Sequence, residues 1–338
     1  MCEARGARIP PRLEGKSWDM NVAITGGGGF LGRRLAQALL AREGVERIVL
    51  FDSSPALPAI GDNRVEARCA DLLAKGVADS VAAQADVIYH LAAVVSGQAE
   101  AEFDLGMSVN LDATRSLLEA ARARGRRPKF VFTSSLAVFG PPLPRTVTEE
   151  TALHPQSSYG VQKAVGELLV ADFSRKGFVD GCVLRLPTVC VRPGSPNAAA
   201  SSFVSGIIRE PLGGKPANCP VGRDLELWLS SPRAVVANLV HAASVPGGTL
   251  GPGRVVNLPG ITVSVGEMIE ALERVAGPRA AGLISFNEDA TVRRIVSSWP
   301  ARFDVRRALE LGFVRDPDFV SLVRDFLGGD APFPLRKA

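Results

Sequence analysis

A glycine-rich segment near the start of the chain constrains the fold more than any other feature. The residues VAITGGGGFLGRRLAQALL, 22–40, pass from a short apolar run through four consecutive glycines into an amphipathic helical pattern. Gly26, Gly29 and Gly32 satisfy GxxGxxG, and the last two form GxGxxG with Gly27. Missing side chains at this spacing let backbone amides and a helix N-terminus approach a pyrophosphate. The segment therefore predicts the strand, turn and helix that open a dinucleotide-binding α/β fold.

An acidic residue at the end of the next apolar run specifies the dinucleotide. The run ERIVLFD ends at Asp52, 20 positions beyond Gly32. A carboxylate placed there accepts hydrogen bonds from the ribose hydroxyls of NAD and repels the 2′-phosphate of NADP. The following Ser53, Ser54 and Pro55 supply no arginine that could hold such a phosphate. NAD is therefore the expected cofactor, whereas a plain glycine turn with a solvated aspartate would leave the spacing unexplained.

Short apolar runs alternate with helical patterns through the first half of the chain. This alternation is typical of an α/β protein with a Rossmann-like, doubly wound parallel sheet. Ligands bind such sheets at the carboxyl ends of the strands, so residues that follow the runs are candidate site residues. The expected strands are 21–25, 47–51, 64–70, 86–93, 129–135 and 181–187.

Three polar residues in the middle of the chain are arranged for proton transfer. Tyr159 and Lys163 stand four positions apart in YGVQK, so both side chains fall on one face of a helix. Ser135 ends the fifth apolar run. An ammonium beside a phenol stabilises the phenolate and lowers the phenol pKa, which makes general acid–base catalysis the expected role of this trio. The only other tyrosine, Tyr89, lies inside an apolar run and is expected in the core.

Composition fits a large globular protein without a nucleic-acid or membrane partner. Of the 338 residues, 46% are hydrophobic, which is enough for one elaborate domain or two closely joined ones. The net charge is only +4, and the basic cluster RARGRRPK is short and ends a helical pattern, as solvated helix termini do. No apolar run is long enough to span a membrane, and the first residues lack the apolar stretch of a secretory signal.

The cysteines indicate reduced thiols. They are scattered without the CxxC spacing of zinc sites and form no pattern of a disulfide framework. We therefore expect no metal and a cytoplasmic location. The five positions are Cys2, Cys69, Cys182, Cys190 and Cys219.

The pattern changes after residue 187, where loops rich in proline and glycine separate shorter elements. We expect a helix in 264–277, because Ser264 and Glu267 form a capping box and Gly277 ends the pattern. Further helices are expected in 303–313 and 318–327. The expected organisation has four parts. A flexible extension, 1–19, precedes an NAD-binding Rossmann domain, 20–187. A smaller, mainly substrate-binding α/β region, 188–330, and a tail, 331–338, follow.

The order of the motifs resembles the extended short-chain dehydrogenase/reductase family, which includes nucleotide-sugar epimerases and dehydratases. The motifs TGGGGFLG, HLAA, VNLDATRSLLEAA, TSSLAVFG, YGVQK and LRLPTV follow one another as they do in that family. The resemblance implies a Rossmann fold, NAD and a catalytic centre with Tyr159 as base, Lys163 as its activator and Ser135 as the hydroxyl that orients the substrate. It also implies a homodimer that packs the helices of VNLDATRSLLEAA and SYGVQKAVGELLVADF.

Cofactor contacts are expected at the ends of several strands. The glycine turn, the residues after the fourth and sixth runs, and the positions that the resemblance carries over contribute to this set. Its members are Gly26, Gly29, Phe30, Leu31, Gly32, Asp52, Asp71, Leu72, Leu91, Ala92, Ala93, Val94, Asn110, Tyr159, Lys163, Pro187 and Val189.

Two departures from the family pattern bear on the substrate. Many nucleotide-sugar members carry LRxxNVYGP, whereas this chain has Thr188 in place of the asparagine and Arg192 shortly after it. The segment VFG carries Phe139 where the family often has tyrosine, which would remove a hydroxyl from the site. Both departures disfavour a nucleotide sugar and suit a small acid.

A small hydroxy acid needs an anchor for its carboxylate, and the planar fork of arginine fits one. Arg192 and Arg233 are the candidates; the alternative for each is a solvated or structurally paired arginine. Loop serines could bind substrate hydroxyls, although such serines more often cap turns. The expected substrate-binding residues are Ser96, Ser135, Tyr159, Thr188, Arg192, Ser201 with its neighbour Ser202, and Arg233.

Three functions are compatible with these features. The first, which the resemblance implies, is NAD-dependent oxidation of a small sugar acid in its catabolism, with D-erythronate giving the 2-keto acid. In this reaction Tyr159 takes the hydroxyl proton while hydride leaves the same carbon for NAD. The second is a nucleotide-sugar 4-epimerase or dehydratase, which would retain NAD through each cycle. The third is a non-catalytic dinucleotide-binding regulator, against which the intact trio argues. His90, inside an apolar run, is expected to be a core residue and not an acid or base.

Overall fold

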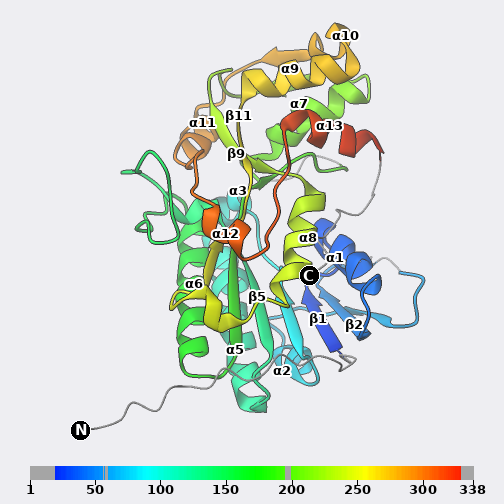
Figure 1. Cartoon of the computed structure of the whole chain (residues 1–338), viewed down its shortest axis with the longest axis vertical. Helices are drawn as coiled ribbons and strands as arrows, with labels where there is room; N and C mark the ends of the chain where they lie inside the picture. Colours follow the sequence, from blue (N-terminus) through cyan, green and yellow to red (C-terminus); the bar gives the residue numbers. More distant parts are fainter. Residues whose placement is uncertain (1–19, 56, 58–59, 195–198, 329–338) are drawn as a thin grey trace.

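The central element of the fold is a seven-stranded parallel sheet (Figure 1). The computed structural model describes residues 20–328 except 56, 58–59 and 195–198, so the expected extension 1–19 and tail 331–338 lie outside the described residues. The strand order is β10-β6-β5-β4-β1-β2-β3, and every neighbouring pair is parallel. The strands are β1 Met20–Thr25, β2 Val45–Asp52, β3 Val65–Cys69, β4 Val87–His90, β5 Lys129–Ser135, β6 Asp180–Leu186 and β10 Val255–Asn257.

Six of these strands are the six apolar runs, so the predicted doubly wound sheet is confirmed. The strand order reverses between β1 and β4, where the crossovers to either side begin. This reversal opens a crevice at the carboxyl ends of those strands, which is where dinucleotides bind in such folds.

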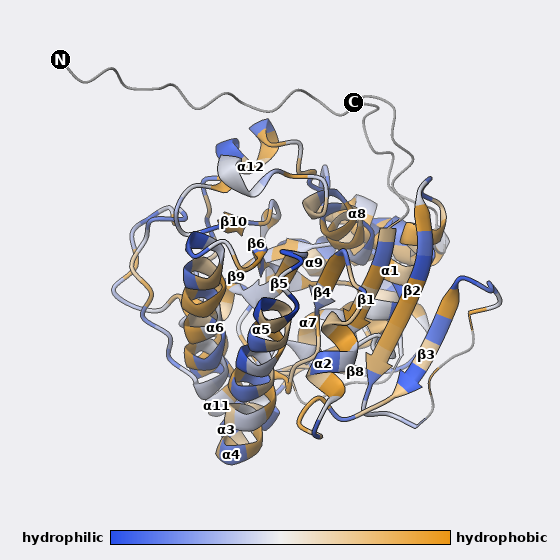
Figure 2. Cartoon of the chain, turned by 90° about the horizontal axis from the view of Figure 1, so that it is seen from below, coloured by the Kyte–Doolittle hydropathy of each residue, from blue (hydrophilic) through white to orange (hydrophobic). Residues whose placement is uncertain are grey.

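Helices cover both faces of the sheet. In Figure 2, α5 and α6 lie on one side of the strands, and α1 and α8 lie on the other. α2 packs against α5, and α1 packs against α8. The helices around the sheet are α1 Phe30–Leu40, α2 Val77–Ala82, α3 Ser96–Ala101, α4 Phe103–Gly106, the π-helix η1 Met107–Asp112, α5 Ala113–Arg124, the 3-10 turn η2 Leu136–Val138, α6 Ser158–Arg175, α8 Pro232–Ala242 and the 3-10 turn η3 Gly247–Leu250.

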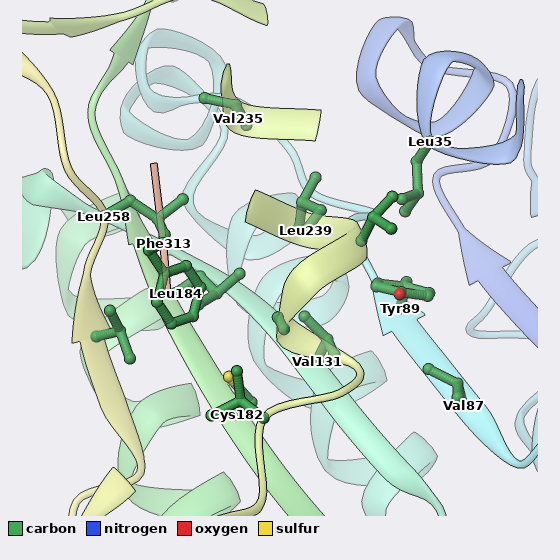
Figure 3. Packing of buried hydrophobic residues seen from close by; sticks show 14 of the residues in the cluster. Leu35, Val87, Tyr89, Val131, Cys182, Leu184, Val235, Leu239, Leu258 and Phe313 are labelled. Atoms are coloured by element: carbon green, nitrogen blue, oxygen red, sulfur yellow. The ribbon is translucent and has the colours of Figure 1, made fainter. Parts of the chain in front are cut away.

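Alternation along the strands divides the core into two layers. Tyr89 of β4 faces Leu35 of α1 and Leu239 of α8 in one layer (Figure 3). Its neighbour Ile88 points to the opposite face, where it packs in a cluster with Leu117 of α5. Full burial of such an aliphatic side chain contributes about 1.5–3 kcal/mol. Because both faces are buried, the central strands read as continuous apolar runs in the sequence.

The later part of the chain builds a second layer of elements above the carboxyl ends of the strands (Figure 1). The predicted capping box is confirmed, since the hydroxyl of Ser264 accepts from the amide of Glu267 and the glutamate accepts in return from the amide of Ser264. The elements are β7 Thr188–Val189, α7 Ser202–Leu212, β8 Ala217–Cys219, β9 Glu226–Ser230, β11 Ile261–Ser264, α9 Val265–Ala276, α10 Pro278–Ala281, β12 Ile284–Phe286, α11 Ala290–Ser297 and α13 Phe319–Gly328.

These elements form two small sheets, β11-β9-β7 and β12-β8, around a core of their own. Four elements after residue 187 belong with the large sheet instead. β10 pairs with β6, and α8 covers the face that α1 covers. The 3-10 turn η3 and the helix α12 Arg306–Glu310 pack in the cluster that contains Leu35. The division at residue 187 stays a prediction. No helix in the described part of the chain combines the length and apolar character needed to cross a membrane.

Candidate active site

The predicted site residues meet at the carboxyl ends of β1, β4, β5 and β6. A cavity of about 420 Å³ lies there, next to the reversal of strand order. The glycine turn after β1 lines one part of it, and the start of α6 lines another. Residues of β7 and of the segment that follows it close the cavity from the second layer. Four separate strand ends thus converge on one space: the three ends that the sequence placed at the nicotinamide and the end of β1 with its glycine turn.

The glycine turn is shaped to bind an anion. Gly26 has a φ of 70°, and a Cβ at this position would lie 2.7 Å from the amide nitrogen of Ala92, so only glycine fits. α1 begins at Gly29 with no capping hydrogen bond from a described side chain. The amides of its first turn, from Phe30 on, have no acceptor within the helix and border the cavity. These amides, together with the helix dipole, fit the pyrophosphate of a dinucleotide.

Asp52 lies beside this turn at the end of β2. One carboxylate oxygen accepts from the amide of Gly28 at 3.0 Å, and the other accepts from the amide of Ser54 at 3.0 Å. Each oxygen keeps a further lone pair, so the carboxylate can still accept from two ribose hydroxyls. The residues present therefore fit NAD.

The predicted catalytic trio is brought together by a close approach of α6 to the turn after β5. The hydroxyl of Ser157 caps α6 by accepting from the amide of Gly160 at 3.2 Å. A Cβ on Gly160 would lie 2.2 Å from the carbonyl oxygen of Ala137, so only glycine lets the helix start this close to η2. Tyr159 consequently lies in the same cavity as Ser135.

Ser135 is oriented to donate a hydrogen bond. Its Oγ accepts from the amide of Ala137 at 3.1 Å, which uses one lone pair and leaves the hydroxyl proton available. Because Ser135 borders the cavity, this proton can be given to a substrate oxygen or to Tyr159.

Burial governs the protonation of both Tyr159 and Lys163. Burial raises the pKa of Tyr159 to about 12, while a hydrogen bond with Ser135 lowers it. The sequence predicted that this pKa would be lowered by Lys163, and the structure differs because burial of the phenol raises it. The Nζ of Lys163 lies 5.8 Å from the Tyr159 ring centroid and packs over Phe132. Burial lowers the pKa of Lys163 itself to about 7, although the carboxylate of Glu167 raises it.

The buried lysine predicts a specific dependence of stability on pH. Lys163 releases its proton near pH 7 when folded and at its higher, ordinary pKa when unfolded. Between these values the unfolded chain binds more protons, so the free energy of unfolding rises with pH. This contribution of Lys163 decreases as pH falls and has been lost once pH has fallen through about 7. We expect the wild type to gain stability over a Lys163→Met variant between pH 7 and pH 10. Urea denaturation at several pH values measures this difference, and a constant difference across the range would contradict the assignment.

Most predicted site residues line the cavity. From the predicted cofactor set the structure brings there Gly26, Gly29, Phe30, Leu31, Gly32, Leu91, Ala93, Tyr159, Lys163, Pro187 and Val189. From the predicted substrate set it brings there Ser96, Ser135, Tyr159, Thr188, Arg192 and Ser201.

The remaining predicted cofactor residues do not line the cavity. Asp52 sits behind the glycine turn, and Ala92 packs against Gly26. Asp71 and Leu72 follow β3 near the end of β2, where Ala70 donates to the carbonyl oxygen of Asp52 at 2.8 Å. This edge of the sheet suits the adenosine half of the dinucleotide. Val94 and Asn110 bond to each other below the cavity wall.

Two residues singled out in the sequence lie elsewhere. Arg233 is on α8, where its guanidinium pairs with the carboxylate of Asp325 at 2.9 Å, and it does not line the cavity. Phe139 is fully buried, with its ring against the guanidinium of Arg185 and the ring of Phe303. Its replacement of tyrosine therefore changes the packing beneath the site rather than the cavity surface.

Sequence reasoning missed part of the cavity wall. Trp299 reaches the cavity from the second layer, beyond α11, far along the chain from the catalytic motifs. A tryptophan in the turn SSWP is the only sequence signal for it. The other unpredicted lining residues are Val95, Thr133, Ser134, Leu136, Ala137, Leu186 and Ala199.

A larger cavity, of about 690 Å³, lies in the second layer around α9 and β11. None of the predicted site residues lines it, and its rim carries arginines and carboxylates together, Arg274 and Glu270 among them. The chemistry of the trio is confined to the smaller cavity.

Comparisons with known proteins agree on one family. The sequence profile of the NAD dependent epimerase/dehydratase family matches residues 22–229. The chain is 54% identical over 318 residues to D-erythronate dehydrogenase from Cupriavidus necator, covering 91% of this chain and 98% of that protein. It is 48% identical over 316 residues to D-erythronate dehydrogenase from Haemophilus influenzae, covering 92% and 100%. A solved structure, the nucleoside-diphosphate-sugar epimerase from Agrobacterium tumefaciens, superposes with a TM-score of 0.86 at 44% identity, covering 97% and 99%.

Proposed function

Because this chain belongs to the NAD dependent epimerase/dehydratase family, we propose that it is an NAD-dependent dehydrogenase that oxidises D-erythronate to its 2-keto acid. The family predicted from the motifs is confirmed by the profile match, and NAD as cofactor agrees with the fit of Asp52 and the glycine turn. The identities of 54% and 48% to D-erythronate dehydrogenases, over nearly the full length of each, support the substrate.

The observation that carries the proposal is the charge of the cavity. Among the described residues that line it, the charged side chains are Lys163 and Arg192, and both are basic. A cationic cavity favours an anionic substrate. Lys163 belongs to the catalytic trio, so Arg192 is the group we assign to the substrate carboxylate.

Several contacts fix the backbone of Arg192 at the cavity. Its amide donates to the hydroxyl of Ser205 at 3.0 Å, and its carbonyl oxygen accepts from Arg209 at 2.8 Å, so α7 holds this segment. The side chain of Arg192 is half-buried, and this burial lowers the pKa of its guanidinium. A guanidinium in this state interacts strongly with a carboxylate, and its planar fork can bind one with two hydrogen bonds.

The mechanism follows from these positions. Arg192 holds the carboxylate and Ser135 donates to the oxygen at C2, so that this hydroxyl faces Tyr159. The phenolate of Tyr159 takes the hydroxyl proton, and Lys163, when protonated, stabilises that phenolate. NAD, when bound, supplies the hydride acceptor. The protein contributes position and charge, while Thr188, Ser96 and Ser201 supply hydroxyls for the remaining substrate hydroxyls.

Nicotinamide absorbance tests the function directly. Purified protein would be incubated with NAD or NADP and with D-erythronate, L-threonate, glycerate, a uronate or a UDP-hexose. We expect NAD to be reduced with D-erythronate. If no acid reduced NAD and the UDP-hexose were interconverted without net NADH, the chain would be an epimerase, as the name of the Agrobacterium tumefaciens relative suggests for that protein.

Arg192→Gln is expected to raise the KM for D-erythronate about 100-fold and to leave the KM for NAD unchanged. Loss of a charge-assisted pair of hydrogen bonds of about 3 kcal/mol gives an effect of this size. Steady-state kinetics with each substrate varied in turn measures it. Arg233→Gln is the matched control, because its ion pair with Asp325 lies outside the cavity. Equal effects of the two substitutions would remove Arg192 from the substrate site.

We also propose that the enzyme is a cytoplasmic homodimer. Three large apolar side chains, Phe103 of α4 with Val161 and Leu168 of α6, are exposed. Val161 and Leu168 are seven positions apart and so share one helix face, which supports the pairing of α6 with a second copy. Sedimentation velocity at micromolar concentration checks the dimer. The four cysteines within the described ranges are free, which suits a reducing compartment.

A further inference from the structure

His90, the last residue of β4, is fully buried and uses both ring nitrogens. Nδ1 lies 2.7 Å from the hydroxyl oxygen of Thr25, and Nε2 lies 2.9 Å from that of Thr114. The histidine lies in the core, as was predicted from its position inside an apolar run. Its two partners belong to β1 and α5, so the ring joins a central strand on one side to a helix on the other.

The direction of each hydrogen bond follows from the protons available. The hydroxyl of Thr114 donates to the carbonyl oxygen of Asn110 at 2.8 Å, so it must accept the proton of Nε2. Nδ1 is then unprotonated and accepts from the hydroxyl of Thr25. The Thr25 oxygen in turn accepts from the amide of Ala92 at 3.4 Å. One tautomer of His90 therefore satisfies every partner.

The hydrogen bonds divide into two arms, one starting at each ring nitrogen of His90. The arm that starts at Nδ1 connects His90 to the glycine turn expected to bind the dinucleotide. Thr25 is the residue before Gly26, and Ala92 is the backbone against which Gly26 packs. A fixed Thr25 hydroxyl sets the distance between the ends of β1 and β4. This distance determines where the glycine turn and the first amides of α1 stand.

The arm through Nε2 leads to the catalytic helix. Thr114 holds the backbone of Asn110, whose side chain is 1% exposed. The Asn110 amide accepts from the Val94 amide at 2.8 Å and donates to the Val94 carbonyl at 3.0 Å. It also donates to the side chain of Gln162 at 2.7 Å. Gln162 precedes Lys163 in α6, so this arm connects the end of β4 to the helix of the catalytic trio.

We propose that His90 is a positioning residue that sets the dinucleotide turn through Thr25 and the catalytic helix through Thr114 and Asn110, without touching a reactant. The inference rests on the proposed dehydrogenase function for its kinetic readout. Its physical basis is the low-dielectric interior, where a satisfied network is rigid and an unsatisfied polar group is costly.

The histidine stays neutral in the working range of the enzyme. Burial, together with the smaller effect of the charge of Lys163, lowers the pKa of His90 to about 3. The described groups that hydrogen-bond within this network are hydroxyls, amides and backbone, which do not titrate there. His90 variants are therefore expected to keep the pH–rate profile of the wild type. Replacement of a general acid or base would instead remove one ionisation from that profile.

Two substitutions separate the arms. The amide of His90→Asn reaches the position of Nδ1 and keeps the bond to Thr25, while the amide of His90→Gln reaches the position of Nε2 and keeps the bond to Thr114. We expect the asparagine variant to keep its affinity for NAD and lose about tenfold in kcat. We expect the glutamine variant to keep kcat and bind NAD about tenfold more weakly, since one buried hydrogen bond corresponds to about a factor of ten.

Steady-state kinetics with D-erythronate gives kcat, and fluorescence titration gives the Kd for NAD independently of turnover. Tyr89→Phe is the matched control, because its buried hydroxyl has no hydrogen-bond partner among the described residues and it precedes His90 in β4. Thr25→Val and Thr114→Val should reproduce the two separate effects, which covers the case of a His90 variant that fails to fold.

The proposal is overturned if the asparagine and glutamine variants lose kcat and NAD affinity together, in proportion to a fall in Tm, because that pattern indicates a purely structural residue. A lost limb in the pH profile would overturn it as well, in favour of acid–base catalysis. If the wild type did not oxidise D-erythronate, the Kd for NAD would still separate glutamine from asparagine, so failure of the substrate assignment is recognised separately.

Discussion

Tyr159→Phe is expected to reduce kcat by about 10³-fold while leaving the affinity for NAD intact. Removal of a positioned general base costs about 10²- to 10⁴-fold, and the remaining ring keeps its packing near Lys163 and Ser135. Because burial raises the pKa of Tyr159, ionisation of the phenol limits the wild-type rate at neutral pH, and the rate should rise with pH. The phenylalanine variant should lack this dependence. Initial rates across pH, with a fluorescence titration of NAD, measure both effects.

The control for this variant is Ser135→Ala, which removes the donor to the substrate oxygen and leaves the base in place. It should lose less activity than Tyr159→Phe and keep the rise with pH. Near-full turnover by the phenylalanine variant, with NAD bound normally, would rule out Tyr159 as the base.

Arg185→Met is expected to cost about 3–5 kcal/mol of unfolding free energy, the typical effect of leaving a buried charge without its partner. Arg185 and Glu167 are almost completely buried, and the guanidinium binds the carboxylate through Nε at 2.9 Å and Nη2 at 2.7 Å. The hydroxyl of Ser134 also donates to this carboxylate. Without the arginine, Glu167 would retain a charge in a site from which water is excluded.

Two further variants make this measurement specific. Arg175→Met breaks an exposed pair with Asp172 and should change the unfolding free energy by less than about 0.5 kcal/mol. The double variant Arg185→Met/Glu167→Gln removes both charges but keeps an acceptor for Ser134, so it should recover most of the lost stability. Urea denaturation of all three is the test. A cost for Arg185→Met as small as that for Arg175→Met would show that the buried pair adds nothing.

Local spacing was sufficient to predict the local arrangement of several candidate site residues. The glycine turn, Asp52 and the Tyr159 and Lys163 pair each depend on residues close in sequence, whose relative positions are set by one turn or one helix. The six apolar runs predicted the sheet for the same reason, because burial on both faces leaves a continuous signal. The convergence of the strand ends then followed from the topology of a parallel sheet.

Contacts between segments distant in the chain could not be predicted from the sequence. Arg192 and Arg233 both follow apolar segments, and only the ion pair with Asp325 separates a structural arginine from one at the cavity. Trp299 reaches the cavity through packing of the second layer. The pKa shift of Tyr159 was predicted in the wrong direction, because the expected effect of Lys163 ignored the burial of both groups.

The strand β10 has a consequence for synthesis of the chain. Residues that make β1 to β6 have all been translated by residue 187, yet the outer edge of β6 is covered only by Val255–Asn257. One face of the sheet also stays uncovered until α8 has been translated, because side chains of α8 complete the cluster that contains Leu35. A nascent chain on the ribosome therefore carries an open strand edge and an uncovered apolar face for some 70 further residues, at the stage when such surfaces recruit chaperones or aggregate. The NAD-binding half matures late, although it is made first.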